Sequence, residues 1–312
     1  MTHANILKAS NLVDEEPTGI ASTDEVRLVK DANGLDYIEI ENRYATAKLA
    51  LQGAHVMHWQ PKTTAEPVLW LSSNARYTPG RSIRGGVPVC WPWFGAHPTD
   101  SSYCPHGFAR VIPWQVIKSC KLPNGTTRLR LEMTQTETAK KQLSYPYQLT
   151  LEITIGNYLR LEMTTKNLAN HPFMIGEAFH TYFNVSDVKS THVTGLENLV
   201  YSDKVEGYIR NVQHGPLQFD GEFDRVYINS DEDCIIRDSG FKRAIRVAKS
   251  GSNTTVIWSP GAEKVAQMSD MGAPDEWRKM LCVESANAME NSVTIFPGES
   301  HTMVTEYSLE LL

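Results

Sequence analysis

Two side chains that could exchange protons near neutral pH stand in apolar surroundings, far apart in the sequence. His180 lies within the aromatic cluster 179–183, and Glu284 follows the apolar run 280–283. Burial would keep the histidine near neutral and raise the pKa of the carboxyl, which suits both to acid–base work. Strand alternation would place Cys282 and Glu284 on one face, which favours burial of the glutamate. Each residue also has a structural interpretation, as a packed histidine or as a strand-edge glutamate facing water.

Two arginines stand in glycine- and proline-containing stretches. Arg84 precedes Gly85-Gly86, and Arg110 ends the segment 105–110, which also holds His106. A guanidinium group binds phosphate oxygens through two parallel hydrogen bonds and keeps its charge at any working pH. The pair therefore favours an anionic ligand, although its spacing does not by itself bring the two side chains together. His106 alone is more often an interior histidine with satisfied hydrogen bonds.

Three further features allow more than one interpretation. Trp91 and Trp93 predict either an apolar floor for a sugar ring or an aromatic-rich core crossing, and composition does not decide between them. Asp224, next to Arg225, could bind sugar hydroxyls or form an exposed ion pair. The sequence holds no P-loop, no G-x-G-x-x-G and no G-x-S-x-G, which argues against nucleotide-dependent chemistry and serine hydrolases.

The metal-binding and cysteine patterns are weak. His55 and His58 have a spacing compatible with metal binding, but no matching pair stands nearby, so we interpret them as strand residues and expect no metal. The five cysteines are odd in number and form no C-x-x-C pair. This pattern indicates free buried thiols in a reducing cytoplasm.

Charge and hydropathy exclude several classes of protein. The formal net charge is −6, from 30 basic and 36 acidic residues, with no basic run. A nucleic-acid-binding protein would need a basic face. Segment 1–16 lacks the apolar region of a signal peptide, and the longest apolar stretch, 85–96, is too short to span a bilayer. We expect a cytoplasmic protein that binds neither nucleic acid nor membranes, and a monomer, since nothing marks an interface.

Short strands are predicted along most of the chain. Segment 1–24 has no periodicity and is interpreted as a lead-in. The alternating or apolar segments that follow are 37–41, 45–49, 128–133, 148–155, 158–165, 243–248, 254–258 and 303–311. Gly156-Asn157 tolerates positive φ and predicts a tight hairpin turn. Helical signals are short, at 136–143 and 274–278.

This pattern predicts an all-β protein. Many strands with helices only in connections indicate a large antiparallel β-sandwich rather than a βαβ arrangement. No repeat and no Gly/Ser linker divides the chain. We therefore expect residues 25–312 to form a single domain.

Five short motifs occur in an order that resembles a known family. They are Arg84-Gly85-Gly86-Val87-Pro88, Trp91-Pro92-Trp93-Phe94-Gly95, His106-Gly107-Phe108-Ala109-Arg110, His180-Thr181-Tyr182-Phe183-Asn184 and Val283-Glu284. Together they are similar to the D-hexose-6-phosphate mutarotases, or glucose-6-phosphate 1-epimerases, of the aldose 1-epimerase superfamily. The resemblance covers roughly residues 25–312, and five motifs in one order are far more specific than any one of them.

The resemblance implies roles for individual residues. His180 and Glu284 would be the catalytic pair, and Arg84 and Arg110 would bind the phosphate of a small phosphorylated sugar. His106 and Asp224 would lie near the sugar. The implied fold is a β-sandwich of the galactose mutarotase type, and no cofactor is implied. Some relatives carry glutamine where this chain has Pro105, so that contact must be absent or supplied elsewhere.

The chemistry of anomer exchange suits this pair. A base removes the proton of the C1 hydroxyl while an acid protonates the ring oxygen; the ring opens, the C1–C2 bond rotates, and closure gives the other anomer. We assign Glu284 as the base and His180 as the acid, with Glu284 charged and His180 protonated in the active form, and expect a bell-shaped pH profile. The alternatives are an aldose 1-epimerase for free sugars and a non-catalytic carbohydrate-binding protein.

Overall fold

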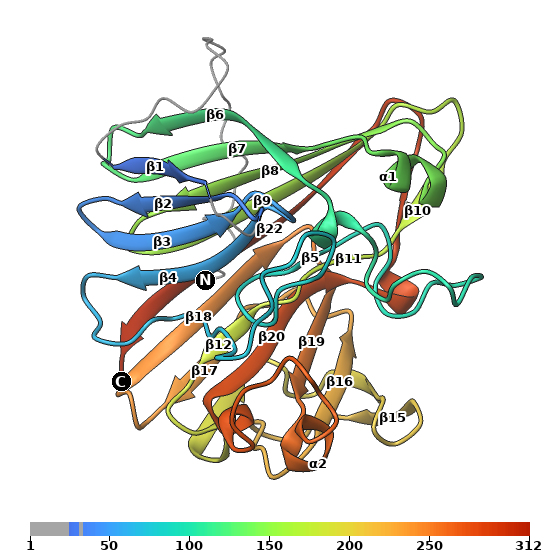
Figure 1. Ribbon diagram of the computed structural model, residues 1–312. Coiled ribbons are helices and arrows are strands. Elements are labelled where there is room, and N and C mark those ends of the chain that lie inside the picture. Colours follow the sequence, from blue (N-terminus) through green and yellow to red (C-terminus); the bar gives the residue numbers. More distant parts are fainter. Residues whose placement is uncertain (1–24, 31–33) are drawn as a thin grey trace, which may run out of the picture.

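Two large antiparallel sheets form the molecule (Figure 1), and the computed structural model describes residues 25–30 and 34–312. The predicted lead-in, 1–24, lies outside the described residues. One sheet, which we call the β22 sheet, has the strand order β13-β17-β18-β22-β9-β8-β7-β6. The other, the β20 sheet, has the order β15-β14-β16-β19-β20-β11-β5, and β12 also pairs with β20. The all-β sandwich predicted from the sequence is confirmed.

The strands have the following bounds. The β22 sheet contains β6 (Trp114–Lys121), β7 (Thr127–Met133), β8 (Tyr147–Ile155), β9 (Tyr158–Asn167), β13 (Thr191–Thr194), β17 (Cys234–Asp238), β18 (Arg243–Ser250) and β22 (Ser300–Leu311). The β20 sheet contains β5 (Val89–Cys90), β11 (Glu177–Phe179), β12 (Tyr182–Asn184), β14 (Val200–Asp203), β15 (Ile209–Val212), β16 (Phe223–Ile228), β19 (Thr254–Ser259) and β20 (Met280–Asn287). Two smaller sheets contain β1 (Val26–Val29), β2 (Tyr37–Glu41), β3 (Ala45–Ala50) and β4 (His55–Pro61), and β10 (Phe173–Ile175) with β21 (Val293–Ile295).

Helices occur only as short turns in the connections. They are α1 (Glu137–Gln142), α2 (Gly261–Val265) and the 3-10 turns η1 (Ala109–Val111), η2 (Val188–Ser190), η3 (Glu276–Lys279) and η4 (Met289–Asn291). The Thr136 hydroxyl caps α1 by accepting a hydrogen bond from the backbone N–H of Ala139 at 3.1 Å. Both predicted helical segments are therefore confirmed as one- or two-turn elements.

The predicted hairpin is also confirmed. Strands β8 and β9 pair from Tyr147↔Asn167 to Ile155↔Leu159 around Gly156-Asn157. Neither turn residue takes the positive φ that the sequence suggested. The register of the two long strands is determined by their alternation of apolar and polar residues, since a slip of one residue would turn the apolar set to the other face.

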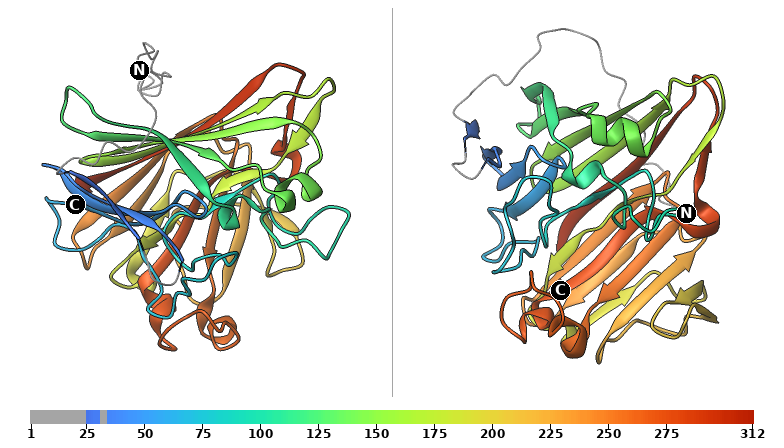
Figure 2. Two further views of the ribbon diagram at one scale, coloured as in Figure 1. Left: turned by 45° about the horizontal axis from the view of Figure 1, so that its top comes forward. Right: turned by 45° about the vertical axis from the view of Figure 1, so that its right-hand side comes forward.

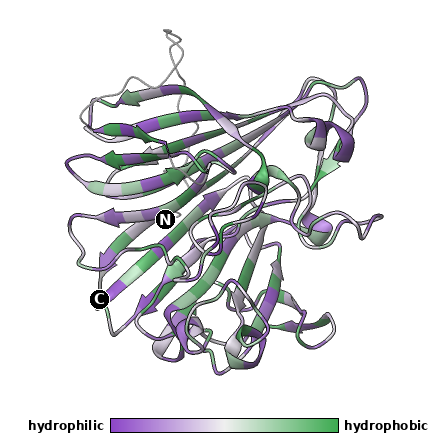
Figure 3. Cartoon of the chain, in the orientation of Figure 1, coloured by the Kyte–Doolittle hydropathy of each residue, from purple (hydrophilic) through white to green (hydrophobic). Residues whose placement is uncertain are grey.

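Side-chain alternation explains how the sheets pack (Figure 3). Strand β7 alternates strictly between buried and half-buried residues, with Leu129, Leu131 and Met133 facing the interior. Strand β20 is different, because all eight of its residues are buried. One of its faces meets the β22 sheet, where the Ser285 and Thr305 hydroxyls lie 2.9 Å apart. The other face is therefore covered by something else, and that is where the candidate site lies.

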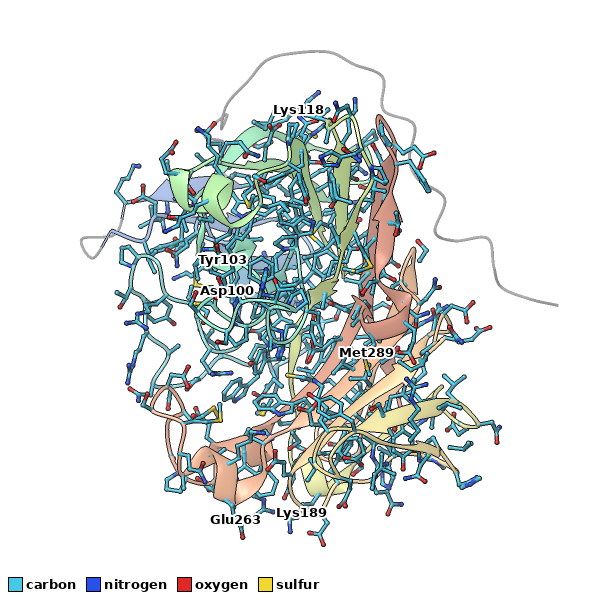
Figure 4. All side chains as sticks on the ribbon, turned by 90° about the vertical axis from the view of Figure 1, so that its right-hand side faces the viewer. Asp100, Tyr103, Lys118, Lys189, Glu263 and Met289 are labelled. Atoms are coloured by element: carbon cyan, nitrogen blue, oxygen red, sulfur yellow. The ribbon has the colours of Figure 1, made fainter. Side chains whose placement is uncertain are left out.

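Two further views show how the rest of the chain surrounds this strand. In Figure 2 the sheets splay apart at one edge, and loops from the first half of the chain lie over the middle of the β20 sheet. Figure 4 shows side chains filling the space between the layers, with Lys118 of β6 at one end of the molecule and Glu263 of α2 at the other.

Candidate active site

The register of β20 brings His180 opposite Glu284. Strand β11 pairs Phe179 with Ser285, and β12 pairs Tyr182 with Cys282, so both follow one continuous register along β20. In that register the residue facing Glu284 is His180. Its Nδ1 lies 3.4 Å from Glu284 Oε1, and its backbone N–H donates to Pro88 O at 3.0 Å. The pair predicted from two distant motifs is therefore brought together by cross-strand pairing.

The same face of the β20 sheet carries Asp224. Directly paired residues of antiparallel strands point to one side, and Asp224, Trp258, Cys282 and Tyr182 pair in a single row. Glu284 lies two residues beyond Cys282 and so shares that face. Lys204 extends the row: its backbone N–H donates to Asp224 O at 2.8 Å, and its Nζ lies 3.1 Å from Asp224 Oδ1.

The loop that carries Arg84 is held by close backbone packing. A Cβ on Gly86 would lie 2.3 Å from Val56 O, and one on Gly85 would lie 2.6 Å from the Cα of Leu71. Both positions therefore require glycine. The ring of His55 is buried against this loop, with Nε2 2.8 Å from Gly85 O, and burial lowers its pKa to about 4. His55 is thus a strand residue that supports the loop, as the sequence predicted.

Arg84 reaches the site but already has partners. Its Nη1 donates to the Tyr182 hydroxyl at 2.9 Å, and its Nε and Nη2 both lie within 3.1 Å of Asp270 Oδ2. Tyr182 stacks on His180, with ring centroids 4.9 Å apart. Arg84 therefore orients the aromatic ring that stacks on His180, and its charge is largely balanced by Asp270.

Arg110 is held differently. Its Nη2 donates to the carbonyl of Pro105 at 2.6 Å, and among the described residues it forms no ion pair with a carboxylate. Pro105 cannot supply a side-chain amide to a substrate, and here its carbonyl orients the arginine instead. The charge of Arg110 is thus available to an anion.

His106 lies beside His180. It has φ 66°, its ring centroid is 5.5 Å from that of His180, and its Nδ1 accepts a 3.4 Å hydrogen bond from the backbone N–H of Gly95. Burial, with Arg110 nearby, lowers its pKa to about 3. A neutral imidazole in this position can exchange hydrogen bonds with a hydroxyl group without carrying charge.

Burial shifts the pKa values of both His180 and Glu284. It raises the pKa of the Glu284 carboxyl well above its ordinary value, and it lowers that of His180 well below, where His106 and Arg110 add to the effect. The expected ion pair, with Glu284 charged and His180 protonated, is therefore not the state that this environment favours; desolvation favours the neutral pair. Both oxygens of Glu284 and Nδ1 of His180 are buried without a hydrogen-bond partner.

The aromatic residues of the site are not those suggested by the sequence. Trp91 is fully buried in the core, where its Nε1 donates to the Thr165 hydroxyl at 2.9 Å. Trp93 packs on Phe108 and donates to Cys104 O. These contacts favour the core-crossing interpretation, because Trp91 is fully enclosed and Trp93 is largely buried.

Four residues of the site were not singled out by sequence reasoning: Tyr182, Lys204, Trp258 and Asp270. Trp258 lies edge-on to both His180 and Tyr182. Tyr182 could have been found, because it stands two residues from His180 and so shares its strand face. Lys204 and Asp270 gave no signal, since their positions depend on long-range pairing and on the conformation of the loop between β19 and β20.

Comparison with known proteins shows which family this chain belongs to. The model of the aldose 1-epimerase family matches residues 36–308. This chain belongs to the aldose 1-epimerase family and is an epimerase, which confirms the resemblance seen in the five motifs. Among the described residues, no helix is long and apolar enough to cross a membrane.

Individual relatives extend over nearly the whole chain. An Escherichia coli protein named "Putative glucose-6-phosphate 1-epimerase" is 38% identical over 82% of this chain and 84% of its own length. A protein of the same name from Cenchrus ciliaris is 33% identical over 87% of this chain and 84% of its own. The crystal structure of a "putative mutarotase" from Salmonella typhimurium superposes with a TM-score of 0.86 at 29% identity, covering 95% of this chain and 97% of the other.

Proposed function

We propose that this protein interconverts the α and β anomers of hexose 6-phosphates, with glucose 6-phosphate as the main substrate and Glu284 and His180 as the catalytic pair. One observation supports the pair above all: a carboxyl and an imidazole, 3.4 Å apart, are buried without hydrogen-bond partners. Leaving such groups unpaired costs free energy unless a ligand completes them. The names of the two relatives at 38% and 33% identity support the phosphorylated substrate.

The proton balance of the reaction fits the two groups. Glu284 takes the proton of the C1 hydroxyl and His180 gives one to the ring oxygen, which breaks the C1–O5 bond and leaves an aldehyde. The pair then holds a neutral carboxylic acid and a neutral imidazole. When the ring closes on the other face of the aldehyde, Glu284 gives its proton back to O1 and His180 takes the proton of the O5 hydroxyl. Burial favours the neutral pair, and so it favours the state that accompanies the ring-opened sugar.

Nearby cations oppose this effect and keep the charged state within reach. Lys204 and Arg110 both lower the pKa of Glu284 against the larger effect of burial. The carboxyl can therefore lose its proton again when a cyclic sugar binds. We assign Lys204 a positioning role, because its contact with Asp224 holds both its own charge and that carboxylate beside the site.

The phosphate is assigned to Arg110 first and to Arg84 second. Arg110 has only a carbonyl partner, whereas Arg84 is shared with Asp270 and Tyr182. His106 and Asp224 are assigned to the sugar hydroxyls, since both lie on the edge of the catalytic face. The protein has a net charge of −6, so the cations near the buried Glu284 carboxyl do not reflect a generally basic surface. They are a feature of this site.

NMR saturation transfer between the anomers of glucose 6-phosphate, galactose 6-phosphate, free glucose and free galactose tests this function. We expect faster exchange for the phosphorylated sugars only, and loss of turnover with retained binding in His180→Ala. The rate should show a bell-shaped pH dependence, because the active pair carries one proton in total.

Two outcomes would reject parts of the proposal. Equal enhancement for free and phosphorylated sugars would indicate a general aldose epimerase. Binding without any enhancement would indicate a carbohydrate-recognition protein. A phosphate monoester itself titrates near pH 6, so the pH profile has to be repeated with any free sugar that is turned over.

A further inference from the structure

One buried thiol stands beside the catalytic pair and has no part in the anomer exchange described above. Cys282 is fully buried and lies two residues from Glu284 on the same strand face. It pairs directly with Tyr182, the residue that stacks on His180. One ligand atom from each of His180, Cys282 and Glu284 lies within 4.8 Å of the other two.

We propose that His180, Cys282 and Glu284 form a binding site for a thiophilic divalent cation such as Zn²⁺, and that occupancy of this site excludes the sugar. An imidazole nitrogen, a thiolate and a carboxylate are the three protein ligands that Zn²⁺ accepts most readily. Three such ligands with the fourth position open to solvent or substrate is a common arrangement at accessible zinc sites.

The geometry needs little adjustment. Zn–N and Zn–O bonds of about 2.0–2.2 Å in a tetrahedron place the two ligand atoms about 3.4 Å apart. His180 Nδ1 and Glu284 Oε1 lie 3.4 Å apart. The sulfur has to approach by roughly an ångström at most to reach the somewhat longer spacing of a zinc–thiolate bond. Rotation about the Cys282 side chain can supply that movement.

The unsatisfied atoms point to a ligand at the same place. Glu284 is 1% exposed and both of its oxygens lack a hydrogen-bond partner, as does Nδ1 of His180. A cation would bind His180 Nδ1 and one oxygen of Glu284 together with the Cys282 sulfur. The negative charges of the thiolate and the carboxylate balance a divalent ion. The thiol proton leaves to solvent on binding. The positive charges of Lys204 and Arg110 act on the same carboxyl and oppose the added charge of a metal ion. Binding should therefore be reversible by a chelator.

The site overlaps the catalytic pair, so zinc and sugar should exclude each other. This consequence rests on the proposed function, whereas the binding itself does not. A hard cation such as Mg²⁺ prefers oxygen ligands in octahedral geometry and should not bind here. The property that distinguishes this site is therefore a preference for Zn²⁺ over Mg²⁺ that requires the sulfur of Cys282.

The test uses the untagged full chain with Cys104→Ala, which removes the exposed thiol. Competition with a chromophoric chelator measures Zn²⁺ affinity, and anomer exchange is measured in parallel. We expect one equivalent of Zn²⁺, inhibition competitive with sugar and reversed by chelator, and no effect of Mg²⁺. Adding Cys282→Ala should weaken Zn²⁺ binding by about a hundredfold, since even indirect partners of a metal contribute up to that much.

Cys90→Ala is the matched control. Cys90 is also fully buried and lies in the same sheet, paired with Ala178, but it is not a member of the cluster. Its loss should leave Zn²⁺ affinity unchanged. Unchanged affinity in Cys282→Ala, or an equal loss in Cys90→Ala, would overturn the proposal.

A spectroscopic measurement on the parent chain tests the sulfur ligand directly. Co²⁺ bound to a thiolate gives a near-ultraviolet charge-transfer band, which we expect in the parent chain and not after Cys282→Ala. Absence of that band in the parent would also overturn the site. If the sulfur-dependent binding is present but no anomer exchange is found, the metal site stands and the proposed function fails.

Discussion

Two carboxyl–imidazole pairs lie on opposite faces of the β20 sheet, and they differ in how many hydrogen-bond partners the protein gives the carboxylate. On the face toward the β22 sheet, Glu177 Oε1 lies 2.9 Å from His301 Nε2 and accepts a second hydrogen bond from Asn287 Nδ2 at 2.9 Å. On the other face, Glu284 and His180 lie 3.4 Å apart without a hydrogen bond. Both carboxylates are almost completely buried.

The imidazoles respond in opposite directions. The hydrogen bond and charge of Glu177 outweigh burial and raise the pKa of His301, whereas burial lowers that of His180. Glu177 Oε1 has two partners within the protein, although Glu177 Oε2 is buried without one, whereas neither oxygen of Glu284 has a hydrogen-bond partner. The comparison teaches that burial alone does not distinguish the two carboxylates; the lack of a hydrogen-bond partner on both oxygens of Glu284 is what supports the role proposed for it.

Removing the carboxylate of Glu284 gives the largest expected effect on the rate of anomer exchange. Glu284→Gln should lower the rate of anomer exchange by roughly 10²–10⁴-fold, the usual contribution of a positioned acid or base. Its unfolding free energy at pH 7 should be equal or higher, because the raised pKa of Glu284 makes ionisation unfavourable to the folded state. NMR exchange and thermal unfolding measure the two quantities.

Glu177→Gln is the control for that experiment, since it alters a buried carboxylate of the same sheet without touching the catalytic face. It should retain most of the activity and lose stability. If the two variants lost activity equally, the distinction between partnered and unpartnered carboxylates would be wrong.

His301→Ala tests the structural pair from its other side. Removing one partner of a buried ion pair leaves the other without compensation, and the expected loss is about 3 kcal/mol of unfolding free energy. The rate of anomer exchange per folded molecule should remain near that of the parent. Chemical denaturation with a constant m-value measures the loss, and a change below about 0.5 kcal/mol would show that Asn287 alone satisfies Glu177.

Arg110 and Arg84 show a similar contrast, because Arg84 is paired with a carboxylate and Arg110 is not. Arg110→Met should raise the KM for glucose 6-phosphate by roughly 10–100-fold, since a hydrogen bond to a charged group contributes about 1.5–3 kcal/mol. Arg84→Met should raise it less, because Asp270 already shares that guanidinium. Neither substitution should raise the KM for a free sugar as much. Equal increases for the free and the phosphorylated sugar would show that the phosphate assignment is wrong.

Local patterns in the sequence predicted the all-β class and eight of the described strands, but not others of ordinary length such as β6 and β16. Strict alternation in 128–133 and the apolar pair around Gly156-Asn157 correspond to β7 and to the β8–β9 hairpin. Very short strands such as β5, with two residues, carry no periodicity and were not predicted. Their existence depends on neighbours far away in the chain, here Ala178 and Phe179 of β11.

The site was predictable only where a motif carried it. His180, Glu284, His106, Arg110, Arg84 and Asp224 do lie around one face of the β20 sheet, while their catalytic and binding roles remain proposals. The directions of both pKa shifts agree with the expectation that burial would keep His180 neutral and raise the pKa of Glu284, whereas the charged active form remains a prediction. No local pattern in the sequence reports which residues two packed layers bring together. Lys204 was missed for the same reason: only the pairing of β14 with β16 places it beside Asp224.

The smallest expected effect is the pH dependence of stability contributed by His301. Its folded-state pKa is raised above the ordinary value, so this contribution is complete below about pH 6.5 and is lost as pH rises through the folded pKa. The slope cannot exceed about 1.4 kcal/mol per pH unit for one proton. Lys249 acts in the opposite direction, because burial lowers its pKa to about 8 and stability rises above that pH. The difference between the parent and His301→Asn, measured by urea unfolding from pH 6 to 9, isolates the histidine; a difference that does not change with pH would mean that Glu177 does not hold a proton on His301.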